Sequence, residues 1–502
     1  MAQVASQITQ SEDELVSVGD GDGIEAETLQ KIKKRSVSGA VSYFIRTGFI
    51  NVIGFISAAI LGVYLSPEDF GVYGIVLQII GLLTFVSDVG LAAALIQKKE
   101  TPKLADYRTA FTLQQILSWV IVIAATAIGL SPLFKEKAGD AGFWILVATA
   151  LSFPLATIKT VSSVMLERKL NFSKLVLPQI VEQIVFQVTL LYLVLNGKGV
   201  LSFAYAIIIR SIVGTVVMMY LQPWKIGFAW DKPALKSLLG FGAKFQVNDL
   251  LARVKDQLFY LVLGLTLSNK EFGYINWAKQ WSMYPYSLTV QNVMAITFPT
   301  FSRLQGHTQL LKKAIEKSLF FITIILFPML AGMIVLSGPL VLVLPVYAKW
   351  QPAILSLILF TASIGWSAIS TPLTNALTAI GKINTTLWLM VMWIILTWIV
   401  TPICIWVFGF NGVAVAAFCI SFTSFVPLYF VNKVVPLAFG EALWRQTVAA
   451  IVMCIVGWVG IPIWQKSILH FMLGGVVMVV VYVIAVLIVG RAKLVQEIRS
   501  LR

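Results

Sequence analysis

The chain has 502 residues, of which 58% are apolar and only 12% are charged, and its mean hydropathy is +0.86. Because a soluble domain carries about 25% charged residues, these numbers exclude a soluble multidomain enzyme, a secreted disulfide scaffold and a disordered protein. An integral membrane protein remains. The net charge of +15 does not indicate nucleic-acid binding, since the basic residues lie mostly in short connectors between apolar runs, as membrane orientation requires.

The sequence offers few residues suited to metals, cofactors or nucleotides. The three cysteines lie within apolar runs, and the two histidines, His307 and His470, are far apart. Neither a disulfide framework nor a metal site is therefore expected. The chain shows no glycine-rich phosphate loop, which argues against nucleotide hydrolysis within it. We expect no cofactor.

The N-terminal segment differs from the rest of the chain. Residues 1–30 contain seven acidic residues and no Lys or Arg, a composition that predicts disorder. They also lack the basic start and apolar stretch of a signal peptide. A basic cluster at 31–35 then precedes the first apolar run. We therefore expect residues 1–38 to form a disordered cytoplasmic tail.

A helix that crosses the bilayer needs about 20 mostly apolar residues. The chain contains fourteen such runs, at 39–64, 71–97, 107–130, 141–165, 176–196, 199–221, 237–266, 273–300, 313–337, 352–379, 384–408, 412–432, 443–464 and 467–490. The run 237–266 is unusually polar. Gly338-Pro339 and Pro345 interrupt a further apolar stretch at 338–351, which could dip into the membrane.

The placement of basic residues tests this topology. With the N-terminus in the cytoplasm, the inner connectors and tails hold 24 Lys and Arg, and the outer connectors hold six. This asymmetry predicts an even number of spans with both termini in the cytoplasm. The last residues, 491–502, would be a cytoplasmic C-terminal segment.

Two short segments repeat at an offset of 202 residues. Gly62–Gly71 and Gly264–Gly273 share the pattern G-x-x-L-S-x-x-[DE]-F-G, each between two predicted spans. Drift of two unrelated hairpins towards similar turns is one explanation. Duplication of a six-span unit is the other, and it predicts two parallel lobes, 39–221 and 237–432, with two additional helices at 443–490.

Charged residues within the predicted spans are costly, at about 2.5–3.5 kcal/mol for one at a helix centre. The run 237–266 carries five of them, in two stripes at helical spacing. Asp249, Arg253 and Asp256 form one stripe, and Lys244 and Lys255 lie on the other together with Asn248. We expect this face to contact protein or water. Mutual neutralisation of Asp249 and Arg253 within a packed bundle is the structural alternative.

Other predicted spans also carry ionisable residues. Arg46 and Asp88 lie at similar depth and could form an ion pair, whereas Lys159 and Glu182 are shallow enough to reach the membrane surface. The candidate substrate-binding residues are Arg46, Arg210, Lys244, Asn248, Arg253, Lys255 and Lys279, and the candidate coupling or gating residues are Asp88, Asp249 and Asp256.

The excess of bases over acids in this set favours an anionic substrate, because arginine binds phosphate through two parallel hydrogen bonds. Tyrosines and tryptophans at 274–286 suit either stacking against sugars or interfacial packing. An exporter of cationic drugs or metabolites would require an acidic or apolar cavity. A membrane-embedded glycosyltransferase or polymerase would require a large loop with a catalytic carboxylate or histidine, and the longest outer connector, 338–351, has neither.

Several motifs resemble polysaccharide flippases, the polysaccharide-transporter branch of the multidrug/oligosaccharidyl-lipid/polysaccharide (MOP) exporter superfamily. They are Leu65–Tyr73, Ser87–Leu91, Ile96–Glu100, Leu166–Phe172, Phe298–Leu304 and Lys349-Trp350. The likeness covers roughly residues 36–490.

The resemblance implies a two-lobed, fourteen-helix exporter in a bacterial inner membrane, and not an enzyme. It would move a polyprenyl-diphosphate-linked oligosaccharide from the cytoplasmic to the periplasmic leaflet by alternating access, in exopolysaccharide, O-antigen or capsule biosynthesis. A proton or sodium gradient would supply the energy. Its expected partners are membrane lipid, a polysaccharide polymerase and glycosyltransferases.

Overall fold

The computed structural model describes residues 46–87, 91–98, 100–169, 171–233, 235 and 254–499, and every element in these ranges is helical. The prediction of an all-α protein is therefore confirmed. The described residues divide between two compact units, with the division after Gly273.

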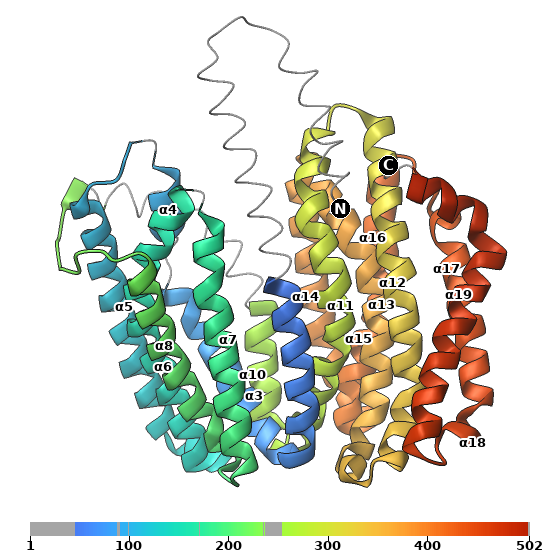
Figure 1. The fold of residues 1–502 in the computed structure, drawn as a ribbon, viewed down its shortest axis with the longest axis horizontal. Coiled ribbons are helices and arrows are strands. Elements are labelled where there is room, and N and C mark those ends of the chain that lie inside the picture. The colour runs from blue at the N-terminus through green and yellow to red at the C-terminus, as the bar shows by residue number, and fades with distance from the viewer. Residues whose placement is uncertain are drawn as a thin grey trace, which may run out of the picture. The chain divides into compact units, whose positions relative to one another are not determined.

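The first unit is a bundle of long helices (Figure 1). Its elements are a helix at Arg46–Tyr64, α3 (Pro67–Ser87), α4 (Leu91–Gln97), α5 (Leu104–Leu130), α6 (Pro132–Arg168), α7 (Phe172–Leu195), the 3-10 helix η1 (Gly199–Leu201), α8 (Ser202–Leu221), the π-helical turn η2 (Val254–Leu258) and α10 (Phe259–Thr266). Helix α6 packs between α5 and α8, α8 also packs on α7, and α3 contacts α5, α6 and α10.

Helix α11 (Asn269–Arg303) begins in the first unit and continues into the second. The second unit further contains α12 (Thr308–Val343), η3 (Pro345–Ala353), α13 (Ile354–Ala379), α14 (Ile383–Phe408), η4 (Gly409–Asn411), α15 (Gly412–Ser421), η5 (Phe422–Ser424), α16 (Phe425–Asn432), α17 (Phe439–Val459), α18 (Ile461–Trp464) and α19 (Ile468–Arg499). Helix α12 packs against α13, α17 and α19 (Figure 1).

The sequence predicts helix interruptions at Gly338-Pro339 and at Pro345, and the structure shows a break only at the second of these. Helix α12 runs through Gly338-Pro339 and ends at Val343, and the break comes only before Pro345. Pro339 is buried near the C-terminal end of α12, where its lack of an N–H leaves the Val335 carbonyl without its usual helix donor. In α6 the chain bends at Gly139, whose φ of 60° favours glycine.

Ten helical runs within the described residues are long and apolar enough to cross a membrane, so the chain is a multi-pass membrane protein. The predicted count of fourteen is not confirmed. One run, Ile383–Asn432, contains two predicted spans, and α3 and α11 are not among the ten. The predicted run 237–266 lies partly outside the described residues.

The two copies of the repeated turn close in the same way. Ser66 donates through its backbone N–H and its hydroxyl to the Asp69 carboxylate, at 2.9 and 3.0 Å. Ser268 makes the same two bonds to Glu271, at 3.0 and 2.6 Å. Each serine therefore caps the helix that follows, in the S-x-x-[DE] capping box. The boundaries predicted for the two lobes stay predictions.

Candidate functional site

Helix α7 presents three polar side chains and one aromatic ring to its neighbours in the first unit. Gln179, Glu182, Phe186 and Gln187 recur at helical spacing and therefore lie on one side of the helix. Each of the four contacts a residue of another helix. This side of α7 is the centre of the candidate site.

The strongest contact on this side is an ion pair. Lys159 Nζ of α6 lies 2.5 Å from Glu182 Oε1, and the two side chains are 24% and 18% exposed. A Cβ atom added to Gly214 of α8 would lie 1.9 Å from the same carboxylate oxygen. Glycine at 214 therefore makes room for Glu182 between α6 and α8.

The helix Arg46–Tyr64 contacts α7 through two further hydrogen bonds. Arg46 Nη1 donates to Gln179 Oε1. Near the other end of the same helix, the buried Ser57 hydroxyl donates to Gln187 Oε1 at 2.6 Å. The predicted ion pair of Arg46 with Asp88 stays a prediction, because Asp88 lies outside the described residues.

Arg210 of α8 lies over an aromatic ring of α7. Its Cζ atom is 4.9 Å from the centroid of Phe186, within the range of a cation–π interaction. Arg46, Lys159, Gln179, Glu182 and Arg210, which we call the α7 cluster, thus combine three basic side chains with one carboxylate.

The structure brings together two of the predicted substrate-binding residues, Arg46 and Arg210, on one side of α7. Lys279 is partly buried in α11, and Asp256 is exposed on η2. Four further predicted residues lie outside the described part of the chain: Lys244, Asn248, Asp249 and Arg253. The side chain of Lys255 is not described either.

Sequence reasoning missed Lys159 and Glu182. The sequence places each of them at a shallow position near the membrane surface and does not predict that they contact each other. The structure pairs them within the bundle. The spacing of Gln179, Glu182 and Gln187 along α7 is the available signal, since polar side chains on one side of a membrane helix must meet protein or water.

Two of the family-like motifs have a structural role. The Arg168 guanidinium donates to the carbonyls of Leu95, Ile96 and Lys98, at 2.8 to 2.9 Å. It therefore satisfies the free carbonyls at the C-terminal end of α4. Lys98 in turn lies 2.8 Å from Asp106. The segments 96–100 and 166–172 hold each other in place.

The aromatic row of α11 packs within the protein. Trp277 is 1% exposed and stacks on Trp350, with ring centroids 4.7 Å apart. Tyr274 is also buried and lies edge-on to Trp350 at 6.2 Å. Tyr286 makes a 2.9 Å hydrogen bond with Thr371. These contacts favour packing over sugar stacking for Tyr274 and Trp277.

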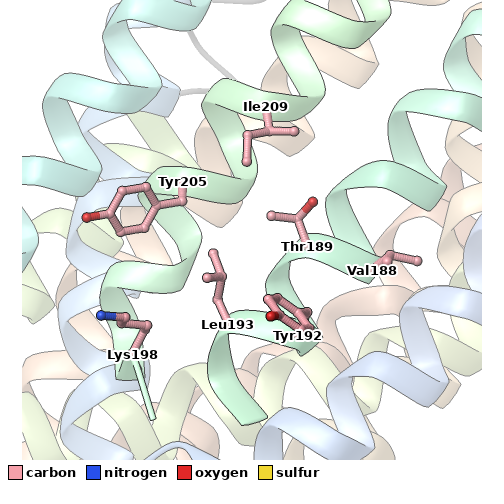
Figure 2. A pocket seen from close by; sticks show the side chains of 7 residues that line it. All are labelled: Val188, Thr189, Tyr192, Leu193, Lys198, Tyr205 and Ile209. Carbon is pink, nitrogen blue, oxygen red and sulfur yellow. The ribbon is translucent and has the colours of Figure 1, made fainter. Parts of the chain in front are cut away.

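Among the described residues, two of the hollows lie outside the α7 cluster. The larger, about 640 Å³, lies between α12, α13 and α17, and small residues such as Ala331, Gly365 and Ala450 line it. Its lining is almost wholly apolar. The smaller, about 360 Å³, lies between α7 and α8, where Thr189, Tyr192 and other side chains surround it (Figure 2).

Comparison with known proteins gives consistent matches. Residues 60–355, more than half of the chain, match the family described as polysaccharide biosynthesis protein. The succinoglycan biosynthesis transport protein ExoT of Rhizobium meliloti is 21% identical over 290 residues, which are 58% of each chain. The lipopolysaccharide biosynthesis protein WzxC of Escherichia coli is 24% identical over 314 residues, 61% of this chain and 62% of that protein. The chain thus matches about three fifths of the length of these relatives.

The fold also matches a solved structure. The lipid II flippase MurJ, in an inward closed conformation, aligns with a TM-score of 0.74 at 15% identity, covering 90% of this chain and 99% of that one. At 15% identity the match shows that the two chains share a fold, and no more than that.

Proposed function

Because the chain belongs to the polysaccharide biosynthesis protein family, we propose that it is a flippase for an anionic lipid-linked oligosaccharide. It moves the polyprenyl-diphosphate-linked sugar from the cytoplasmic to the periplasmic leaflet of the bacterial inner membrane, with both of its termini in the cytoplasm. The substrate is carried across unchanged, so the protein is not an enzyme.

The α7 cluster is the observation that carries this proposal. Three basic side chains from three helices gather around α7, with Glu182 as the carboxylate of the set. Charged side chains within a membrane protein are costly, so they are expected where they pair with each other or line a substrate pathway. A diphosphate supplies the matching negative charge, and the guanidinium groups of Arg46 and Arg210 suit its geometry.

The apolar hollow between α12, α13 and α17 supports a lipid-linked substrate. Its volume and apolar lining suit part of a polyprenyl chain. We further propose that Lys244, Asn248, Arg253, Lys255 and Lys279 contribute to headgroup binding. The carboxylates of Asp88, Asp249 and Asp256 would couple transport to a proton or sodium gradient. The partners of the transport step would be glycosyltransferases and a polysaccharide polymerase.

Deletion of the gene tests the function directly. We expect a diphosphate-linked oligosaccharide to accumulate on the cytoplasmic leaflet, and the wild-type gene to reverse this. In the deletion strain, genes carrying Arg46→Glu or Arg210→Glu should give an export rate about tenfold or more below that of the wild-type gene. Each change places a negative charge at the proposed diphosphate site. Lys198→Glu is the matched control, since Lys198 is exposed in a connector.

Accumulation of a small cationic compound instead would favour a drug or metabolite exporter of the same superfamily. Undiminished export by both arginine variants, at wild-type protein levels, would remove the α7 cluster from the substrate path.

A further inference from the structure

Helix α11 has two unlike sides within the second unit. Val290 and Met294 lie on one side and pack into a hydrophobic cluster with residues of α12 and α13. The other side carries polar residues at i, i+4, i+7 and i+11, which are Gln280, Tyr284, Ser287 and Gln291. Both glutamines are exposed, and residues 280–302 include no charged residue. This side of α11 is therefore polar but uncharged.

Helix α13 carries a row of partly exposed hydroxyl groups at similar spacing, on Ser367, Thr371, Thr374 and Thr378. Tyr286 of α11 joins the two helices through its 2.9 Å hydrogen bond with Thr371. The helices run in the same direction, because α12 returns the chain between them, so Gln291 lies at the level of Thr374 and Thr378. Residues 354–379 also include no charged residue. We call these two polar rows the α11–α13 face.

Other helices of the second unit expose apolar side chains instead. Ile395 and Ile399 of α14 and Val476 of α19 are each at least half exposed, as suits contact with lipid. A glutamine amide in lipid would lose its hydrogen bonds with water, which is costly. The exposed Gln280 and Gln291 therefore indicate that the α11–α13 face meets water or a polar ligand.

The hydrogen bonds of the α13 row determine which ligand groups it suits. Thr371 donates its hydroxyl proton to the Ser367 carbonyl at 2.8 Å, and Thr374 donates to the Ser370 carbonyl at 3.1 Å. Ser367 and Thr378 donate to carbonyls of the same helix in the same way. Because each proton is already donated, the lone pairs of these oxygens remain, and the row accepts hydrogen bonds.

This chemistry separates the two parts of the proposed substrate. The oxygens of an ionised diphosphate only accept hydrogen bonds, so the row gives them no donor. A sugar hydroxyl both donates and accepts, and it suits the row as well as the Gln291 amide. A cationic ligand would be expected beside a carboxylate, and the ranges 280–302 and 354–379 contain none.

We propose that the α11–α13 face binds the sugar part of the lipid-linked substrate, whereas the α7 cluster binds its diphosphate. The uncharged hydroxyl and amide groups of the face match uncharged sugar hydroxyls, and the arginines of the α7 cluster match phosphate. This assignment rests on the proposed function.

Binding of two lipids to the purified full-length protein tests the assignment. One is the diphosphate-linked oligosaccharide extracted from the deletion strain, and the other is undecaprenyl diphosphate, which carries no sugar. Thr371→Val/Thr374→Val should raise the Kd of the glycolipid about tenfold, because two hydrogen-bond acceptors are lost. Gln291→Leu should act in the same direction. Neither variant should change the Kd of undecaprenyl diphosphate.

Two control variants separate binding from folding. Thr371→Ser/Thr374→Ser keeps both hydroxyls and should bind the glycolipid as the wild type does. Thr361→Val makes the same substitution on the same helix, at a fully buried hydroxyl that has no hydrogen-bond partner among the described residues, and should also bind normally. Unchanged glycolipid binding by the valine and leucine variants, or equal loss of both lipids, would overturn this assignment alone. Failure of the wild type to bind either lipid would overturn the proposed function with it.

Thiol labelling gives a second measurement. Gln291→Cys, in a chain whose three native cysteines are replaced by alanine, should react with a water-soluble maleimide about tenfold or more faster than Ile399→Cys, because the reactive thiolate requires water. Ile399 is the matched position, since it is 56% exposed on an apolar helix surface. The glycolipid should slow the labelling of Gln291→Cys, and undecaprenyl diphosphate should not. Equal rates at the two positions, or protection by tetraphenylphosphonium in place of the glycolipid, would overturn the assignment.

Discussion

The polar side of α7 and the aromatic row of α11 both stand out from the apolar background of the sequence, but the structure uses them differently. On α7, the polar side chains reach charged or hydrogen-bonding partners on two other helices, Arg46–Tyr64 and α6. On α11, Trp277 is buried in a stack with Trp350. Charged groups within a membrane must find a partner or water, whereas aromatic rings gain from packing alone.

The largest effect is expected from breaking the ion pair between Lys159 and Glu182. Lys159→Glu places a second carboxylate beside Glu182 and should cost about 3–5 kcal/mol, the range for breaking a buried pair. We expect loss of export and of folded protein, measured by activity and by yield from the membrane. The exchanged pair Lys159→Glu/Glu182→Lys should recover the folded protein, because it restores opposite charges. Failure of the exchange to recover it would mean that the pair needs its present orientation.

The next effect is expected on α11. Trp277→Ala should lower the free energy of unfolding of the purified protein by about 3–5 kcal/mol, because it removes a buried ring from the stack with Trp350. Thermal unfolding of the two proteins measures this change. Trp406→Ala is the matched control, since Trp406 is 88% exposed. Normal stability combined with weakened binding of the glycolipid would instead favour a sugar-stacking role for Trp277.

The smallest effect concerns the space around Glu182. Gly214→Ala should destabilise the protein by about 1–3 kcal/mol, because the new methyl group overlaps the carboxylate. Alanine normally stabilises a helix relative to glycine, so the sign of this change is informative. Gly338→Ala, with no atom within 4 Å of the added Cβ, should be neutral or stabilising in the same thermal assay. A stabilising Gly214→Ala would show that Glu182 can move away freely.

Much of the site was within reach of the sequence. Arg46 and Arg210 were identified because an arginine within an apolar run is costly and needs a reason. The sequence did not identify their partners on α7, Gln179 and Phe186, because neither residue type is unusual in a membrane helix. Lys159 and Glu182 were passed over for a related reason: depth along a helix can be read from the sequence, but the direction of a side chain around the bundle cannot.

The repeated turn shows the same division. Its pattern predicts a tight capped turn in both copies, because serine and a carboxylate three residues later form a local capping box. Nothing in the pattern states that the two copies touch. Gly71 and Gly273 could equally have been required by the turn itself, whereas the structure places each against the backbone of the other copy.

The sequence by itself determined that this protein is helical and crosses the membrane many times, because hydrophobic length and charge asymmetry are local properties of the chain. It also determined the family likeness and the basic character of the candidate site. Only the tertiary structure decided which charges meet, which aromatic rings are buried and which glycines bring two helix ends together. Those outcomes depend on contacts between segments far apart in the chain, such as Lys159 with Glu182 or Gly71 with Asn269.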